Sequence, residues 1–563
     1  MPTIIRKCPT CLKLKEETNR FNVGTITLIT FSCGHSTSEQ NIHSLLRSRF
    51  DSWKNDKHIC NIGDGEDTKC PCFGSEVGFW FNDFGLDSSH VSKRSFHLRP
   101  HQIENLEHFI TSSGKHQIQD ETGLGKTASK LAELKLCPES LPHLILCKGS
   151  LTYQWQKEVF RTLGIVPQVI QTTKEQPNFK FFKIIICSLD KLKRVDWLED
   201  EEVMSNFKGV TIDEIQNIKN ADAKRTKAVQ KACSTIPFIT QLSGTPIENH
   251  AGEYYPSLNI IWPEKFHSKD HFQKAYVTTY WNGYTYKLGG LFNPKEFFNE
   301  TRRVIIRHKS EDVEGMPSVS RDYKLVEIAA SVQEAYEVAE DAFLEAFEQA
   351  EEGIGNAFQR QTNLAAKMQR LRHITGLAKV EASLEFISEF LENNDRKIGI
   401  YVHHDDVGML LNEQLVRICK ERNEPAPINL CGTGPEERAE KIVPFKNGKA
   451  RIMLAKLLAS GEGLDIPECS DYLIIERHWN RAKEIQVEGR GKRLSSKNKI
   501  IFVTYLIGFQ TIDEFMSETN EQKHQYTTEA LEGTAQVYTE SDIMTKIGKA
   551  LKVRGKKKWR MNV

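Results

Sequence analysis

The sequence predicts an α/β protein with two parallel-sheet domains in tandem, a helical insertion between them and a small zinc-binding domain at the amino-terminal end. Three observations predict this organisation. The 563 residues are too many for one hydrophobic core. Short runs of Ile, Leu and Val, bounded by polar or Gly-containing turns, occur in two separate sets, as in buried strands of parallel sheets. Six of the 13 cysteines fall in the first 72 residues, which indicates a metal site.

The composition is that of a folded globular protein, with 39% hydrophobic, 27% charged and 9% aromatic residues. These values exclude disordered, fibrous and disulfide-stapled proteins. No stretch approaches about 18 consecutive apolar residues, and the first residues lack the apolar run of a signal peptide. We therefore expect a cytoplasmic protein, or a nuclear one if the host has a nucleus, without a membrane partner. The formal net charge of +1 neither favours nor excludes a polyanionic partner.

The pattern changes character four times along the chain. It divides the sequence into segments 1–90, 91–315, 316–375, 376–530 and 531–563. The second segment contains a strand-like HQIQ run and expected strands at 143–147, 183–187, 210–213 and 238–244. In 316–375 apolar residues recur every three or four positions among charged ones, which predicts helices with one packing face. Strand patterns resume at 397–402, 428–430, 451–455, 472–476 and 500–506 and predict a second α/β unit.

The carboxyl-terminal segment 531–563 is expected to be a basic tail. Seven Lys or Arg residues and no acidic residue lie between Lys549 and Arg560, with Trp559 among them. Such a tail could neutralise phosphates and stack on a base. A localisation signal and a solubilising end are the alternatives.

The amino-terminal segment contains two close pairs of metal-ligand residues. Cys8 and Cys11 are followed, after 21 intervening residues, by Cys33 and His35. Three thiolates and one imidazole satisfy tetrahedral Zn²⁺, and we expect one structural zinc ion there. Free buried thiols are the alternative.

A second zinc site is also conceivable. Cys60, Cys70 and Cys72 could form it with His58 or His43, although their spacing is irregular and ligands could interleave between the two groups. The module could grip branched DNA or a protein partner, or serve only as a brace on the first domain. A closed four-ligand site leaves no position for water, so no catalytic metal role is indicated.

The sequence QDETGLGKTASKLAEL, which begins at Gln119, predicts a phosphate-binding loop. Gly123 and Gly125 allow the backbone to turn its N–H groups toward phosphates at the start of a helix. Lys126 would reach the β and γ phosphates, and the Thr127 hydroxyl would complete the Mg²⁺ shell. The full eight-residue pattern requires a glycine where this chain has Asp120, so the loop is a shortened variant.

Two further groups fit phosphate chemistry. Asp213 and Glu214 directly follow an apolar strand, where Asp213 could hold Mg²⁺ through water and Glu214 could polarise the attacking water. A turn or helix cap is the ordinary alternative for such a pair. Arg490 and Arg493 are three residues apart and are expected on one helical face, aimed at a γ-phosphoryl group. The alternative for them is a solvated basic helix.

Together these motifs resemble helicase superfamily 2, most closely its Swi/Snf-type DNA translocases, from about Leu98 to Glu514. In the amino-terminal half the resemblance rests on LRPHQIENLEHF, DETGLGKT, LILCKGSLTYQWQKEV, VTIDEIQNIKN and LSGTPIEN. In the other half it rests on KIGIYVHHDDV, LCGTGPEERAEKIVPF, LAKLLASGEGLDIPECSDYLIIERHWNRAKEIQVEGRGKR and TIDE. The stretches HHDDV and RHITGLAKVE are similar to the annealing-helicase and fork-remodelling branch.

The resemblance implies two RecA-like lobes with ATP and Mg²⁺ in the cleft and DNA running across both lobes. It implies catalytic roles for Lys126, Asp213, Glu214, Arg490 and Arg493. It implies nucleotide contacts from Gln102, which would meet adenine, and from Thr122, Gly123, Gly125, Lys126, Thr127, Asp213, Gly463 and Asp465. The implied coupling residues are Gln216, Ser243, Thr245 and Gln486. The implied DNA contacts are Ser188, Thr245, Ser460 and Gly461, which would bind phosphate oxygens without reading sequence.

The function implied by this resemblance is ATP-driven stepping along DNA. The leading expectation is a translocase or helicase that remodels forks or branched junctions. A duplex-tracking motor that displaces proteins or transcription complexes is one alternative, and an ATP-switched adaptor with little turnover is another. The chain departs from the family pattern at Gln216, where His is common, and at Asp465 and Pro467, which are more like the broader superfamily.

Overall fold

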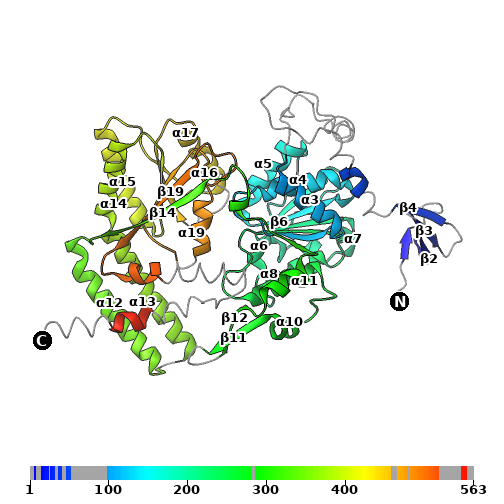
Figure 1. Ribbon diagram of the computed structural model, residues 1–563, viewed down its shortest axis with the longest axis horizontal. Coiled ribbons are helices and arrows are strands. Elements are labelled where there is room, and N and C mark those ends of the chain that lie inside the picture. The colour runs from blue at the N-terminus through cyan, green and yellow to red at the C-terminus, as the bar shows by residue number, and fades with distance from the viewer. Residues whose placement is uncertain are drawn as a thin grey trace.

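A computed structural model describes most of the chain between residues 98 and 518. The described residues are 5–7, 14–23, 26–31, 36–40, 46–51, 98–281, 286–354, 356–457, 466–478, 481–518 and 547–553. Two lobes, each built on a parallel sheet, lie side by side, and a long helical pair lies below the second lobe (Figure 1). The two-sheet α/β class predicted from the sequence is confirmed. No helix among the described residues is long and apolar enough to cross a membrane.

The first lobe contains a seven-stranded sheet in the order β13-β5-β10-β9-β6-β8-β7, with every pair parallel. Its strands are β5 (Lys115–Ile118), β6 (His143–Cys147), β7 (Gln168–Val169), β8 (Ile184–Ser188), β9 (Gly209–Asp213), β10 (Phe238–Leu242) and β13 (Ile305–Ile306). Its α-helices are α3 (Pro100–Thr111), α4 (Lys126–Leu136), α5 (Thr152–Leu163), α6 (Leu189–Leu192), α7 (Glu201–Asn206), α8 (Lys224–Cys233), α9 (Tyr255–Ile261), α10 (Lys269–Tyr276) and α11 (Pro294–Thr301). Its 3-10 turns are η3 (Pro138–Ser140), η4 (Gly149–Leu151), η5 (Asp196–Leu198), η6 (Ile215–Ile218), η7 (Ala251–Tyr254) and η8 (Ser310–Asp312).

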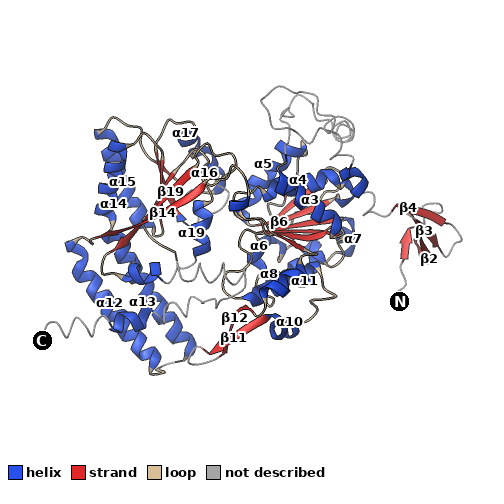
Figure 2. Ribbon diagram, viewed as in Figure 1, coloured by secondary structure: helices blue, strands red, loops and turns tan. Residues whose placement is uncertain are grey.

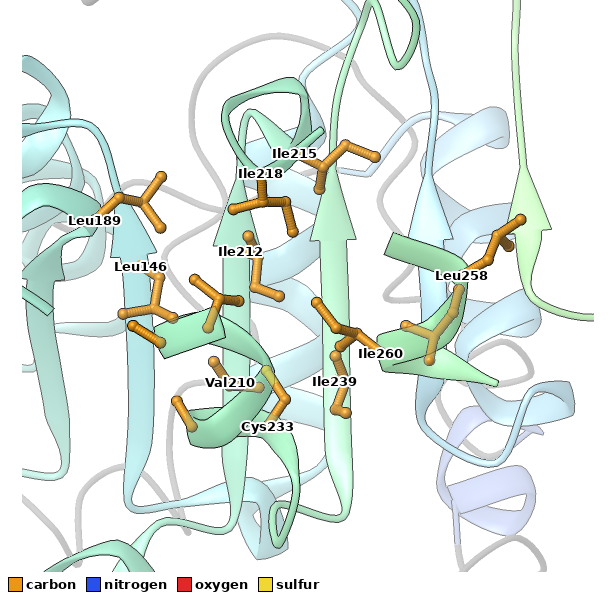
Figure 3. Packing of buried hydrophobic residues seen from close by; sticks show 14 of the residues in the cluster. Leu146, Leu189, Val210, Ile212, Ile215, Ile218, Cys233, Ile239, Leu258 and Ile260 are labelled. Atoms are coloured by element: carbon orange, nitrogen blue, oxygen red, sulfur yellow. The ribbon is translucent and has the colours of Figure 1, made fainter. Parts of the chain in front are cut away.

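Helices cover both faces of this sheet, so alternate residues of each strand enter two separate cores. Leu146, Val210, Ile212 and Ile239 face the side covered by α8 and α9 (Figure 3). The opposite core joins Ile118, Ile145 and Ile186 to α4 and α5. This two-sided burial explains why the strands read as continuous apolar runs.

The second lobe contains a six-stranded parallel sheet in the order β14-β19-β18-β15-β17-β16. Its strands are β14 (Ser318–Val326), β15 (Ile398–Val402), β16 (Ile428–Asn429), β17 (Ile452–Lys456), β18 (Asp471–Ile474) and β19 (Ile500–Gly508). Its helices are α14 (Val380–Asn393), α15 (Asp405–Glu421), α16 (Pro435–Lys441), α17 (Val443–Lys446) and α19 (Arg481–Glu488). Helices and strands alternate in both lobes (Figure 2).

The segment 316–375 is helical only in part, so the expectation of a wholly helical segment was wrong at its start. Residues 318–326 form the edge strand β14, which pairs with β19 over nine residues. Most β14 side chains are exposed, and the strand therefore lacks the apolar run that identified the others. The helices α12 (Ala330–Glu351) and α13 (Ala357–Ala378) follow as an antiparallel pair.

The helical pair also receives part of the segment expected to be a plain basic tail. Residues 547–553 form a helix, and Ile547 and Leu551 join the core of the pair beside Phe343 and Phe347. A Cβ atom on Gly548 would lie 2.5 Å from the Phe347 ring, so this helix packs closely. The described part of the tail is thus a packed element, and the residues after 553 lie outside the described part.

Two antiparallel elements were not expected. The hairpin of β11 (Val277–Trp281) and β12 (Tyr286–Leu291) follows α10 in the first lobe. Near the amino terminus, β1 (Ile5–Lys7), β2 (Leu14–Val23), β3 (Ile26–Phe31) and β4 (Ser36–Gln40) form a four-stranded sheet. The expected zinc ligands lie outside the described residues: Cys8, Cys11, Cys33, His35, Cys60, Cys70, Cys72 and the alternatives His43 and His58. Among the residues that are described, no cluster of His, Cys, Asp and Glu could hold a metal ion.

Candidate nucleotide-binding and catalytic site

The predicted phosphate loop connects β5 to α4 at the carboxyl edge of the first sheet. Gly123 and Gly125 have φ angles of +98° and +80°, which residues with a Cβ atom rarely adopt. Lys126 is the first residue of α4, and its Nζ donates hydrogen bonds to the carbonyl oxygens of Asp120 at 2.7 Å and Glu121 at 3.3 Å. The loop therefore curls around the ammonium group, with the backbone N–H groups of the helix start beside it.

Asp120, which stands where the full loop pattern has glycine, anchors the loop. Its buried carboxylate accepts hydrogen bonds from Asn105 Nδ2 at 2.7 Å, and from the backbone N–H and Nδ1 of His308 at 3.1 and 2.7 Å. Burial alone would lower the pKa of His308, but hydrogen bonds to Asp120 and Glu104 raise it above its ordinary value. In place of a flexible glycine, the shortened loop thus has an aspartate whose side chain anchors it to α3 and to the segment after β13.

Gln102 and His101, at the start of α3, hold the loop from the other side. Gln102 Nε2 donates to the carbonyl oxygens of Leu124 at 3.1 Å and Gly125 at 3.3 Å, and Gln102 Oε1 accepts from Arg99 N–H. His101 Nε2 lies 2.8 Å from the Leu124 oxygen. A Cβ atom on Gly125 would lie 2.5 Å from Gln102 Nε2, so this contact requires glycine.

The acidic pair lies at the carboxyl end of β9, as predicted. Trp155 Nε1 on α5 donates to Asp213 Oδ2 at 2.8 Å. Burial and the neighbouring Glu214 carboxylate raise the pKa of Asp213 to about 7. Burial lowers the pKa of Lys126, and the charges of Glu214, Asp120 and Asp213 oppose that effect. Lysine and both carboxylates therefore share one electrostatic environment.

A chain of hydrogen bonds leads from the acidic pair to the segment after β10. Gln216 Nε2 donates to Glu214 Oε2 at 2.6 Å, and Ser243 Oγ donates to Gln216 Oε1 at 2.8 Å. The Thr245 N–H donates to Ser243 Oγ at 3.0 Å. Glu214 has a left-handed backbone with φ of +55°, which aims its side chain back toward Gln216. The structure therefore brings together three of the four expected coupling residues.

The second lobe meets the phosphate loop directly. A Cβ atom on Gly489 would lie 2.5 Å from Thr122 Cγ2, so the turn after α19 touches the loop. Arg493, in this turn, lowers the pKa of Lys126 by charge repulsion. The turn that carries Arg493 thus lies against the loop that carries Lys126, close enough for the two charges to interact.

The two arginines do not project from a helix, so that expectation was wrong. α19 ends at Glu488, and both residues lie in the turn that follows, where the Arg490 N–H donates to the Val487 oxygen at 2.9 Å. Arg490 is 6% exposed, and its charge acts on Tyr401 and Tyr472 inside the second lobe. The charge of Arg493 acts on Lys126 across the lobes, whereas that of Arg490 acts on these tyrosines within its own lobe.

Further contacts join α19 to the first lobe. Lys483 Nζ lies 3.4 Å from Glu248, a side chain that Lys219 also pairs with. Gln486, the fourth expected coupling residue, is buried in α19, and its Oε1 has no hydrogen-bond partner among the described residues. Glu248 follows the Ser243–Thr245 segment, so this ion pair lies close to the coupling chain in sequence.

Other expected residues have less specific surroundings. Thr127 lies half-buried in the first turn of α4. Ser188 is the N-cap of α6, where its Oγ accepts from the Lys191 N–H at 3.3 Å. The Thr245 Oγ1 is buried without a hydrogen-bond partner in the described part of the chain. The expected residues that lie outside the described part are Ser460, Gly461, Gly463 and Asp465.

The sequence analysis missed His308, Ser310 and Lys492, which link the loop to neighbouring segments. Two signals could have identified them. Asp120 in place of glycine indicates that its carboxylate needs a partner, and His308 and Ser310 follow β13, whose carboxyl end lies at the ligand-binding edge of the sheet. Lys492 lies between the two predicted arginines.

Comparisons with known proteins agree with this two-lobed site. Residues 101–377 match the family model described as SNF2-related domain, and residues 378–495 match the helicase conserved C-terminal domain. The chain is 26% identical over 443 residues to the Xenopus laevis SWI/SNF-related matrix-associated actin-dependent regulator of chromatin subfamily A-like protein 1, covering 77% of this chain and 44% of that protein. It is 24% identical over 449 residues to the Bos taurus DNA annealing helicase and endonuclease ZRANB3, covering 77% and 41%.

A solved structure of the Sulfolobus solfataricus SWI2/SNF2 ATPase core in complex with dsDNA matches 79% of this chain and 98% of its own, at 20% identity and a TM-score of 0.37. The chain spans less than half the length of the two curated relatives. The two family models together cover well over half of the chain, in the order of its two lobes. The chain therefore belongs to the Swi/Snf-type family of helicase superfamily 2, with an SNF2-related domain followed by a helicase C-terminal domain.

Proposed function

We propose that this protein hydrolyses ATP to move along DNA and remodels forked or branched DNA. One observation carries the proposal: the second-lobe turn that carries Arg493 contacts the phosphate loop that carries Lys126, and the charges of Glu214, Asp213 and Arg493 all act on that lysine. A γ-phosphoryl group in transfer spreads charge over three oxygens, and cations from two sides stabilise that charge. Closure of two lobes on one nucleotide converts hydrolysis into relative lobe motion.

The residues fit the expected nucleotide and Mg²⁺. Asp213 and Glu214 are adjacent half-buried carboxylates, and burial together with the charge of Glu214 raises the pKa of Asp213. A divalent cation would neutralise this negative charge. Asp213 and the Thr127 hydroxyl would hold Mg²⁺, which would supply charge neutralisation at the phosphates. Lys126 binds the β and γ phosphates, and Glu214 orients and polarises the attacking water. Arg493 and Arg490 complete the charge around the γ-phosphate, and Gln102 fixes the loop beside the base.

The hydrogen-bond chain from Glu214 supports coupling of hydrolysis to DNA. It ends at Thr245, whose buried hydroxyl lacks a partner in the described chain and is suited to a phosphate oxygen. Ser188, Ser460 and Gly461 would bind the same backbone track. Movement of the DNA phosphates thereby alters the hydrogen bonds of the carboxylate that orients water.

Branched DNA is the preferred substrate of this proposal. Relatives that match over most of this chain include one named a DNA annealing helicase. The stretch HHDDV after β15 and the stretch RHITGLAKVE at the end of α13 are similar to that branch. The amino-terminal cysteines would hold structural Zn²⁺ in a module that senses DNA shape or a protein partner. A motor that displaces proteins from linear duplex is the second candidate, because it would use the same site.

The test is ATPase activity measured with single strands, linear duplex, forks and four-way junctions. We expect hydrolysis to be stimulated most by forks or junctions, and Lys126→Ala to abolish it because the ammonium group is lost. Lys224→Ala, which changes an exposed lysine of the same lobe, is the matched control. Preference for linear duplex without change in strand pairing would favour the displacement motor. ATP binding without DNA-dependent turnover would overturn the proposal and favour an ATP-switched adaptor.

A further inference from the structure

The turn that contains Arg490 and Arg493 also contains Lys492, which reaches back to the first lobe. We propose that Lys492, Ser310 and Glu121 form a positioning bridge between the lobes, which holds Arg493 in register with the phosphate loop. The inference rests on the proposed ATP hydrolysis. It gives a role to three residues for which the sequence motifs predicted none. Lys492 and Ser310 act here through Arg493 and the loop, not on the nucleotide itself.

The first-lobe half of the bridge is formed by hydrogen bonds between the phosphate loop and η8. Ser310 is 6% exposed, and its backbone N–H and Oγ donate to the same Glu121 oxygen, Oε2, at 3.0 and 2.6 Å. Arg307 lies 4.0 Å from the other oxygen of Glu121. Glu121 immediately follows Asp120 in the loop, so the Ser310 hydroxyl is bonded directly to the loop and moves with it.

The second-lobe half is Lys492, whose Nζ donates to the Ser310 Oγ. That oxygen thus accepts from the second lobe while its hydrogen is donated to the first. The backbone agrees with this contact, because a Cβ atom on Gly123 would lie 2.2 Å from the Lys492 carbonyl oxygen. Only glycine in the loop permits so close an approach.

Lys492 and Arg493 lie on the same compact turn. The Lys492 N–H donates to the Glu488 oxygen at 3.3 Å, and the Arg493 N–H donates to the Gly491 oxygen at 2.8 Å. Because the two residues are neighbours in this turn, a shift of Lys492 also shifts the Arg493 backbone. Holding Lys492 on Ser310 fixes the turn that carries Arg493, whose charge acts on Lys126.

The charges favour the bridge when the lobes are together. Burial alone would raise the pKa of Glu121, but hydrogen bonds from Ser310 and the charge of Lys492 hold it below its ordinary value. Burial lowers the pKa of Lys492, and Glu121 and Glu488 oppose that effect. The bridge exists only with the lobes in contact, so its stabilisation is added to the closed arrangement and not to nucleotide binding by the first lobe alone.

The test separates turnover from binding. Lys492→Met keeps most of the length of the unbranched side chain and removes its charge and donors. We expect the DNA-stimulated kcat for ATP to fall about tenfold or more, the effect of one lost hydrogen bond to a charged group, with KM for ATP changed less than about twofold. Lys492→Arg should restore most of kcat, because a guanidinium group can donate to Ser310. Lys497→Met, at an exposed lysine after the same turn, should match the wild type.

A double-mutant cycle identifies the partner. Ser310→Ala should lower kcat, and adding Ser310→Ala to Lys492→Met should lower it little further, because both remove the same contact. Three results would each overturn the bridge: effects of the two substitutions on kcat that multiply, an unchanged kcat in Lys492→Met, or a change in KM alone. If the wild type itself shows no DNA-stimulated hydrolysis that Lys126→Ala abolishes, the proposed function fails instead, and the two failures are distinguishable.

Discussion

Gly489 allows the two lobes to approach, and replacing it tests whether that approach is needed for turnover. A Cβ atom at this position would lie 2.5 Å from Thr122 Cγ2 and 3.1 Å from Thr122 Cβ. Carbon atoms in ordinary contact are about 3.5–4.0 Å apart, so in Gly489→Ala the turn must retreat by about 1 Å. Overpacking of this kind costs about 1–3 kcal/mol, which corresponds to about a 5- to 150-fold loss of rate if it falls on lobe closure.

The assay is DNA-stimulated ATPase activity beside thermal unfolding. The clash joins two lobes, so we expect kcat to fall within that range while the unfolding midpoint stays near that of the wild type. Thr122→Ser removes Cγ2 and keeps the hydroxyl group. The double variant Gly489→Ala/Thr122→Ser should therefore have a kcat close to that of Thr122→Ser alone. Gly434→Ala is the matched control, because a Cβ atom there meets nothing within 4 Å. Full activity of Gly489→Ala, or no rescue in the double variant, would refute the reasoning.

Three further predictions concern hydrogen-bonded and titratable side chains. Gln216→Leu should reduce DNA stimulation of hydrolysis about tenfold by removing both amide hydrogen bonds, whereas Gln216→His should retain it; equal stimulation in both variants contradicts the coupling chain. Glu488→Gln should lower the free energy of unfolding by about 3–5 kcal/mol in urea titration, because it leaves the buried Arg481 without this carboxylate and also weakens the pair with Arg321. A loss below about 1 kcal/mol contradicts this. Burial lowers the pKa of His403 to about 3, so the unfolded chain binds a proton first and stability falls as pH decreases from about 6.5. The decrease in the urea unfolding midpoint between pH 7 and pH 5 should be smaller in His403→Gln than in the wild type. An equal decrease contradicts the role given to His403.

Both sheets could be predicted because their strands are buried on two faces. Runs such as residues 143–147 and 398–402 are almost wholly apolar, and the structure confirms them as β6 and β15. β14 escaped prediction because most of its side chains are exposed at an edge, so that only its pairing with β19 defines it as a strand. The helix at 547–553 was missed for a related reason, since its packing on α12 depends on residues about 200 positions earlier.

The site was predicted unevenly. Lys126, Asp213 and Glu214 follow their strands at the expected edge, because the carboxyl ends of parallel strands share one side of a sheet. Arg490 and Arg493 were expected on one helical face, but both lie in the turn that follows α19. A spacing of three residues places two side chains on one helical face only if the helix continues through both of them. Here the helix ends and Gly489 begins a turn.

The sequence by itself determined the α/β class, the order of the two sheets and the glycine-lysine loop, since the apolar runs of buried strands and the φ demands of glycine are local properties. The tertiary structure alone decided which partners meet: His308 on Asp120, Ser310 on Glu121, and Lys492 on Ser310 across 182 residues of chain. A pattern within one segment says nothing about the distance to a segment that far away. That distance is set by how whole sheets and helices pack, and the charges and hydrogen bonds at the site follow from it.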